Sequence, residues 1–122
     1  MKILKFFAAA LIALFAVGSL NACATASEDP ASFAQIIDVR TPEEWSTGHV
    51  DGAVLYDISG AEFANQIAAL DPAADYFVYC RSGNRAGQAI QYMTSQGFTG
   101  KLVNGGGVAN AASTLGLDVV TD

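Results

Sequence analysis

The sequence predicts one α/β domain with an open, mainly parallel central sheet and helices on both faces. Short apolar runs rich in Val, Ile and Tyr alternate along the chain with stretches whose apolar residues recur at helical spacing. Turn and breaker residues separate these stretches. Strands that alternate with helices in this way are typical of parallel sheets covered on both faces, and ligands bind such sheets beyond the C-terminal ends of the strands.

The first half of the domain is predicted to hold two strands and two helices. An apolar run over residues 36–39 predicts the first strand. Thr41 is a suitable N-cap and Pro42 suits the first helical position, so a short helix is expected to begin there and to stop at Gly48. The two elements expected next are a strand over residues 53–56 and a helix over residues 61–70.

The second half begins with an apolar run over residues 76–80, which predicts the third strand. A helix over residues 86–96 is expected to follow and to end at Gly97. The remaining predicted elements are a strand over residues 101–103, a tight glycine turn over residues 105–107, a helix over residues 108–115 and a last strand over residues 119–120.

The N-terminal segment is predicted to be a targeting sequence that is not part of the fold. Lys2 and Lys5 precede an apolar run over residues 6–17, which is the layout of a secretory signal peptide. This run is shorter than the roughly 20 residues that a membrane-spanning helix needs. We therefore expect residues 1–23 to be a signal peptide, and the protein to be exported to the periplasm or the outer side of the cell envelope.

Two cleavage sites are compatible with the residues that follow. Residues 20–23 read Leu-Asn-Ala-Cys and resemble the bacterial lipobox, in which Cys23 becomes the lipidated first residue of a membrane-anchored lipoprotein. The alternative is ordinary cleavage before Ser27, after an A-x-A sequence. The lipobox is the favoured interpretation, and residues 24–32 are then expected to be a polar tether, in which Pro30 breaks any local structure.

The domain itself, residues 33–122, is small and belongs to an acidic chain. The whole chain has 6 basic and 12 acidic residues and a net charge of −6, and loss of Lys2 and Lys5 would bring it to −8. This charge argues against nucleic acid and anionic lipid as electrostatic partners, so membrane contact is expected only through a lipid anchor. One His and a single Cys besides Cys23 are too few ligands for a usual zinc site, and no metal is expected.

Cys80 is the strongest candidate for chemistry. It ends the third predicted strand and opens a loop, residues 80–85, that reads Cys-Arg-Ser-Gly-Asn-Arg and leads into a predicted helix. Main-chain N–H groups, the start of a helix and the cations Arg81 and Arg85 all stabilise negative charge, and such surroundings lower a thiol pKa from about 8.5. The pattern predicts a nucleophilic thiolate rather than a structural cysteine.

Two segments resemble those of the rhodanese family. Residues 38–53 read D-V-R-T-P-E-E-W-S-T-G-H-V-D-G-A and resemble the family motif D-V-R-x-x-x-E-[aromatic]-x-x-G-H-[IV]-x-G-A. Residues 79–86 read Y-C-R-S-G-N-R-A and resemble the active-site loop C-R-x-G-x-R. With the N-G-G-G of residues 104–107, the resemblance covers about residues 36–120. The nearest subtype is the small exported single-domain sulfurtransferase of the phage-shock periplasmic kind.

The resemblance implies a rhodanese-like domain and a thiosulfate sulfurtransferase that needs no cofactor. Cys80 would attack the outer sulfur of a small anionic donor such as thiosulfate, release sulfite, and hold the sulfur as a persulfide. Cyanide or a thiol, free or on a protein, would then accept it. The residues expected to bind the substrate are Arg81, Ser82, Gly83, Asn84 and Arg85, with Arg85 foremost on the sulfonate.

Three residues of the first motif are expected to support the loop rather than to react. Asp38 and Arg40 flank the end of the first strand, and His49 lies in the turn that follows the short helix. A general-base role for His49 is the weaker alternative to local hydrogen bonding.

Two other readings of Cys80 compete with sulfur transfer. Phosphatases and arsenate reductases on similar domains use a C-x5-R loop, whereas this chain has the shorter C-x4-R, which suits a single sulfur atom better than a phosphoryl group. The second alternative is a sulfur-carrier or redox-sensing module without turnover, and measured turnover with free thiosulfate discriminates it from an enzyme.

Overall fold

The computed structural model describes residues 27–122. The predicted signal peptide, the lipobox and the lipidation site Cys23 all lie outside the described residues. Within residues 27–122, no helix has both the length and the apolar character needed to cross a membrane.

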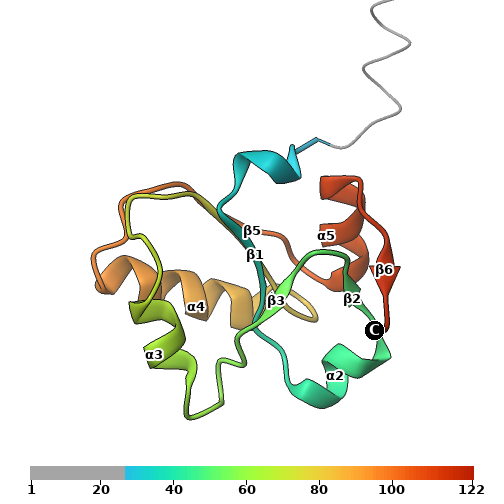
Figure 1. Cartoon of the computed structure of the whole chain (residues 1–122), viewed down its shortest axis with the longest axis horizontal. Coiled ribbons are helices and arrows are strands. Elements are labelled where there is room, and N and C mark those ends of the chain that lie inside the picture. The colour runs from blue at the N-terminus through green and yellow to red at the C-terminus, as the bar shows by residue number, and fades with distance from the viewer. Residues whose placement is uncertain (1–26) are drawn as a thin grey trace, which may run out of the picture.

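The centre of the fold is a sheet of four parallel strands in the order β3-β1-β4-β5 (Figure 1). The strands are β1 (Gln35–Asp38), β3 (Val54–Leu55), β4 (Tyr76–Tyr79) and β5 (Leu102–Asn104). The register pairs Asp38 with Tyr79 and Val78 with Asn104. Because the strands are parallel, the residues after each of them meet at one edge of the sheet, and Cys80 and Asn104 both lie at that edge.

Helices cover both faces of this sheet, as the alternation of elements predicts (Figure 1). They are α2 (Pro42–Thr47), α3 (Phe63–Ala68), α4 (Asn84–Ser95) and α5 (Val108–Leu115). Residues of α3 and α4 form one buried cluster with Ile37 and Val78, whereas residues of α5 form another with Ile36 and Phe77. The alternation of neighbouring side chains between two cores explains why the strand sequences are apolar on both faces.

The helices begin and end close to the predicted capping and breaker residues, with two differences. Thr41 caps α2 as predicted, and its side chain accepts a hydrogen bond from the Glu44 N–H at 3.2 Å. The helix predicted over residues 61–70 is shorter, because α3 begins only at Phe63. The helix predicted over residues 86–96 starts two residues early, at Asn84, so the last two residues of the predicted loop belong to the first turn of α4.

A second, small sheet pairs two segments that are far apart in the chain. The turn predicted around His49 contains the strand β2 (His49–Val50), which pairs antiparallel with β6 (Val119–Val120). The last predicted strand therefore exists but does not extend the central sheet. This pairing brings the C-terminal segment against the first motif.

The predicted tether is folded in its second half, which corrects the expectation that Pro30 breaks local structure. Residues Pro30–Ser32 form a 3₁₀ helix, η1, capped by the Asp29 side chain, which accepts from the Ala31 N–H at 2.9 Å. Proline suits a first helical position because its missing N–H has no partner to lose there. The Glu28 N–H also donates to the Thr114 carbonyl at 3.0 Å, so the segment is hydrogen-bonded to the end of α5.

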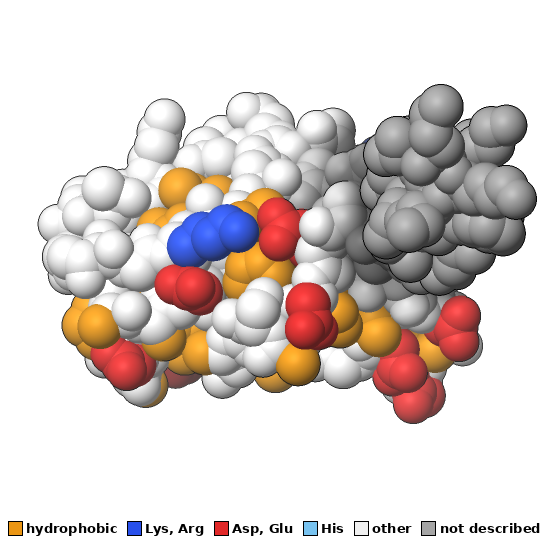
Figure 2. All heavy atoms as spheres, turned by 90° about the horizontal axis from the view of Figure 1, so that it is seen from above, with side chains coloured by type: hydrophobic (Ala, Val, Ile, Leu, Met, Phe, Trp, Pro, Cys, Tyr) orange, Lys and Arg blue, Asp and Glu red, His pale blue; other side chains and the backbone are white. Residues whose placement is uncertain are grey.

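Acidic side chains are spread over the surface seen in Figure 2. On this face of the described chain they stand among apolar side chains, whereas Lys and Arg side chains occur at one place. The face is acidic, in keeping with the net charge of −6 of the whole chain.

Candidate active site

Cys80 lies directly after β4 and is 1% exposed. Its own N–H donates to the Gly106 carbonyl at 2.9 Å, so the glycine turn, residues 105–107, holds the main chain at this point. The Cys80 loop, residues 80–85, then turns back over the sulfur, and the Gly83 N–H donates to the Cys80 Sγ at 2.9 Å. Gly83 has φ +97°, a left-handed conformation that favours glycine.

The surroundings of the sulfur lower the pKa of the Cys80 thiol, in the predicted direction. Burial raises this pKa, but main-chain N–H groups of the loop and of the start of α4 lower it by more. These donors belong to Ala86, Ser82, Gly83 and Arg85. The main-chain amides around the sulfur therefore favour the thiolate form of Cys80.

Arg85 has a partner that the sequence did not predict. Both arms of its guanidinium contact Glu44, with Nη1 donating to Oε1 at 2.7 Å and Nη2 to Oε2 at 2.9 Å. The hydrogen bond from Arg85 is the main reason that the pKa of Glu44 is lowered to about 2. The sulfonate-binding role of Arg85 stays a prediction; in this arrangement its guanidinium joins the start of α4 to α2.

Glu44 serves two elements at once. Its Oε1 also accepts from the N–H of Thr41 at 3.2 Å and so completes the capping box of α2. The sequence signal for this cap was present, since Glu44 stands three residues after Thr41. Its contact with Arg85, 41 residues further along the chain, had no local signal.

The Glu44–Arg85 pair should make stability depend on acid pH. The pKa of Glu44 is about 2 in the folded protein against an ordinary value of 4.5. The pair therefore stabilises the fold above about pH 4.5 and loses its contribution as the pH falls toward 2. We expect Glu44→Gln to flatten the pH dependence of the free energy of unfolding in this window, as measured by urea denaturation.

The neighbouring exposed Glu43 provides a matched control for this measurement. Glu43→Gln removes the same charge from the same helix turn. Glu43 itself forms no ion pair among the described residues. Equal pH profiles for the two variants would contradict the stabilising role of the Glu44–Arg85 pair.

The predicted supporting residues Asp38 and Arg40 form a buried ion pair beside the loop. Arg40 Nη2 lies 2.7 Å from Asp38 Oδ2, and Arg40 is 4% and Asp38 0% exposed. The same Nη2 donates to the Gly48 carbonyl at 2.7 Å, which fixes the end of α2 against the end of β1. This position fits the predicted supporting role, because α2 in turn carries Glu44.

His49 contacts the helix that precedes it. Its ring stacks on Trp45 at a centroid distance of 3.4 Å, and Nδ1 lies 3.0 Å from the Trp45 carbonyl oxygen. Its Nε2 lies 3.7 Å from a carboxylate oxygen of the exposed Asp122. These contacts fit the predicted structural use of His49 in the turn.

The other loop residues lie on the surface around the sulfur. Arg81, Ser82 and Asn84 are exposed, and no ion pair involves Arg81 within the described part of the chain. Arg81 lines an open cleft of about 450 Å³ together with Arg40, which follows β1, and residues of α2. The lining residues are Arg40, Glu43, Glu44, Thr47 and Arg81. Arg81 is thus the basic side chain of the loop that faces open space.

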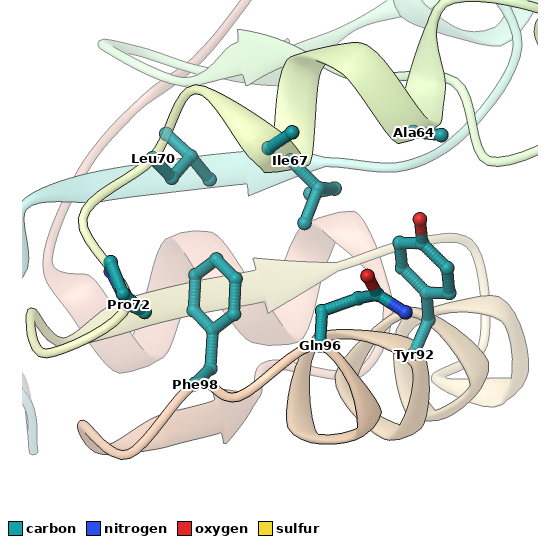
Figure 3. Close-up of a pocket in the computed structure, with 8 residues that line it drawn as sticks. Ala64, Ile67, Leu70, Pro72, Tyr92, Gln96 and Phe98 are labelled. Atoms are coloured by element: carbon teal, nitrogen blue, oxygen red, sulfur yellow. The ribbon is translucent and has the colours of Figure 1, made fainter.

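A different cavity, of about 250 Å³, lies between α3 and the C-terminal half of α4 (Figure 3). Ile67, Leu70 and Phe98 line it with apolar surface, and Tyr92 and Gln96 lie at its α4 side. It contains no residue of the Cys80 loop. Arg81 of that loop lines the cleft of about 450 Å³ instead.

Two glycines of the turn have no room for a side chain. A Cβ on Gly107 would lie 2.4 Å from the Arg81 carbonyl oxygen, and one on Gly105 would lie 2.3 Å from the Phe77 ring. Asn104, which precedes the turn, bonds to both the turn and the loop and was not among the predicted site residues. Asn104 belongs to the N-G-G-G segment of the resemblance, but nothing in the sequence signals the hydrogen bond of its side chain to Gly83, 21 residues away.

The fold and this site define a class of protein: a small α/β domain with a thiolate-stabilising loop at the C-terminal edge of a parallel sheet. A family model described as rhodanese-like domain matches residues 21–112. The chain therefore belongs to the rhodanese family, which confirms the resemblance seen in its motifs.

Curated relatives include two named thiosulfate sulfurtransferases. PspE of Escherichia coli is 33% identical over 76 residues, which are 62% of this chain and 72% of PspE. GlpE of Pseudomonas aeruginosa is 36% identical over 66 residues, which are 54% of this chain and 58% of GlpE. The match to the probable adenylyltransferase/sulfurtransferase MoeZ of Mycobacterium tuberculosis, 32% identical over 85 residues, spans 70% of this chain but only 22% of MoeZ.

Solved structures support the same fold. A rhodanese with anions from Escherichia coli has a TM-score of 0.59 and 28% identity, over 72% of this chain and 98% of that one. The rhodanese-like domain of the Alr3790 protein from Anabaena has a TM-score of 0.61 and 26% identity, over 72% of this chain and 92% of that one.

Proposed function

We propose that this protein is a sulfurtransferase that moves sulfane sulfur from thiosulfate-like donors to cyanide or a thiol, through a persulfide on Cys80. The observation that carries the proposal is the Cys80 sulfur, which accepts a hydrogen bond from the Gly83 N–H at 2.9 Å and whose pKa is lowered by loop amides. The names of the relatives PspE and GlpE point to the same reaction.

The proposed reaction has two displacement steps that balance without an external oxidant or reductant. The Cys80 thiolate attacks the outer sulfur of thiosulfate, a new S–S bond forms, and sulfite leaves with the electron pair of the broken S–S bond. A thiolate or cyanide then attacks the outer sulfur of the persulfide and restores the Cys80 thiolate. The charge stays near the same sulfur atoms throughout, so one set of amide donors can stabilise each state.

Arg81 is proposed to bind the sulfonate of the donor. Both arms of Arg85 are engaged by Glu44, whereas Arg81, the residue after Cys80, is exposed and lines the open cleft. Charge-assisted hydrogen bonds from a guanidinium suit an oxyanion with several oxygens. The acceptor is proposed to enter the same cleft after sulfite has left.

We also propose that the protein acts on the outer side of the cell envelope, held by a lipid on Cys23. The sequence of residues 1–23 supports export, and the Leu-Asn-Ala-Cys sequence supports lipidation over cleavage before Ser27. A diacylglyceryl group provides the two acyl chains that stable anchoring requires.

Intact-mass measurement of the protein isolated from its native envelope tests the proposal in one experiment. We expect a mass that corresponds to a lipidated chain beginning at Cys23. Incubation with thiosulfate should add the mass of one sulfur atom and release sulfite, and cyanide or a thiol should remove that sulfur. A chain that begins at Ser27 would contradict the lipidation but not the sulfur transfer. A protein mass that does not change on incubation with thiosulfate would contradict the proposed reaction.

The carrier alternative predicts a different kinetic result. A sulfur carrier would accept one sulfur atom but would not turn over with free thiosulfate and cyanide. Continuous thiocyanate formation, at many equivalents per protein molecule, would support the enzyme.

A further inference from the structure

We propose that Asn104 is a positioning residue that holds Gly83 in place so that the Gly83 N–H stays directed at the Cys80 sulfur. This inference rests on the proposed function and extends it to a residue outside the loop. It begins from the place of Asn104 at the end of β5, beside β4 in the sheet. Asn104 pairs in register with Val78, two residues before the nucleophile.

The side chain of Asn104 makes two hydrogen bonds that connect the loop with the glycine turn. Its Nδ2 donates to the Gly83 carbonyl at 2.9 Å, and its Oδ1 accepts from the Gly106 N–H at 2.9 Å. The orientation of the amide is fixed, because a carbonyl can only accept and an N–H can only donate. Both ends of one side-chain amide are therefore used.

The two partners of Asn104 are the residues that hold Cys80 on either side. Gly83 donates its N–H to the Cys80 Sγ at 2.9 Å, and Gly106 accepts the Cys80 N–H at 2.9 Å. Asn104 thus closes a ring of hydrogen bonds that runs from the sulfur through Gly83 and Gly106 to the main chain of Cys80. A shift of either glycine would move a group that contacts the nucleophile.

Gly83 needs such a contact because glycine permits its conformation without enforcing it. At φ +97° the residue is free to turn its N–H away from the sulfur. The Gly83 carbonyl is held by the Gly87 N–H at 2.9 Å and by Asn104, so these two donors fix one side of the residue. A Cβ on Gly83 would lie 3.4 Å from the Asn104 oxygen, which shows how closely the two pack.

The charged groups around Cys80 do not include Asn104, so its effect can be separated from theirs. Arg85 on α4 interacts electrostatically with the thiolate and is paired with Glu44 on α2. The Asp38–Arg40 pair lies at the end of the neighbouring strand β1, and Arg81 follows the nucleophile in the chain. Asn104→Ala leaves all of these groups in place.

The test is the rate at which iodoacetamide alkylates Cys80 as a function of pH, followed on the Cys80 peptide by mass spectrometry in the full chain. Loss of one hydrogen bond near the sulfur is expected to raise the midpoint of this profile by about 0.5 to 1 pH unit in Asn104→Ala. Asn104→Asp should raise it further, because the carboxylate cannot donate to Gly83 and adds negative charge.

Asn110→Ala is the matched control. Asn110 reaches the same glycine turn from α5 and donates to the Gly105 carbonyl at 2.8 Å, but it has no hydrogen bond to the Cys80 loop. The midpoint of the alkylation profile of Asn110→Ala should equal that of the wild type. An equal shift in Asn110→Ala would mean that general support of the turn explains the effect, and would overturn the proposal.

Steady-state kinetics provide a second readout. Asn104→Ala should lower kcat for sulfur transfer by about 5- to 10-fold, with little change in the KM for thiosulfate, since the side chain holds the nucleophile rather than the donor. Unchanged alkylation midpoints in both Asn104 variants would overturn the inference. The alkylation assay requires no turnover, so it distinguishes that failure from a failure of the proposed sulfur transfer.

Discussion

Cys80→Ser is expected to abolish sulfur transfer from thiosulfate to cyanide, with a loss of at least about 1,000-fold in kcat/KM. A serine hydroxyl has a far higher pKa than the Cys80 thiol, and it cannot form the S–S bond on which both proposed steps depend. The measurement is thiocyanate formation at saturating cyanide.

The Cys80→Ser variant should still fold, so a loss of activity would report on the nucleophile and not on unfolding. Cys80 is buried, but serine differs from it by a single atom and can accept the same hydrogen bond from the Gly83 N–H. Thermal unfolding followed by circular dichroism provides the control. A folded variant whose activity lies within tenfold of the wild type would rule out Cys80 as the nucleophile.

Asp38→Ala is expected to lower the free energy of unfolding by about 3–5 kcal/mol, because it leaves the Arg40 cation buried without its counter-ion. The Asp38 carboxylate accepts from Nε and Nη2 of Arg40 and also from the Arg40 main-chain N–H at 2.9 Å. Urea denaturation at neutral pH measures the loss.

A double variant separates the buried charge from the lost contacts. Replacing both Asp38 and Arg40 with Leu removes the unpaired cation, and we expect it to be more stable than Asp38→Ala alone. If Asp38→Ala cost less than about 1 kcal/mol, the ion pair would not be the main support of this part of the fold.

Those features of the fold that have a local cause could be predicted from the sequence. Thr41 and Pro42 fixed the start of α2, because capping and the restricted φ of proline act within one helical turn. The position of Cys80 after β4 followed from the end of an apolar run. The β2–β6 pairing could not be predicted, because two-residue strands show no periodicity and their partners are far apart in the chain.

The candidate nucleophile of the site could be predicted from the sequence, but the ion pairs around it could not. The positions of Arg81 and Arg85 in the loop indicated two cations near a thiolate, yet position alone cannot tell which anion a guanidinium binds. Arg85 binds the internal carboxylate of Glu44, which belongs to α2 and is distant from Arg85 in the chain. Asn104 was missed for the same reason, since its two hydrogen bonds join segments that only the sheet order brings together.

The parallel sheet also separates the start of the described chain from the Cys80 loop. The chain enters the domain through η1, which precedes β1 and lies at the end of the sheet where the strands begin (Figure 1). The Cys80 loop lies at the opposite end, after β4. If the protein is anchored ahead of residue 27, as we propose, the Cys80 loop is at the end of the sheet opposite to the one at which the described chain begins.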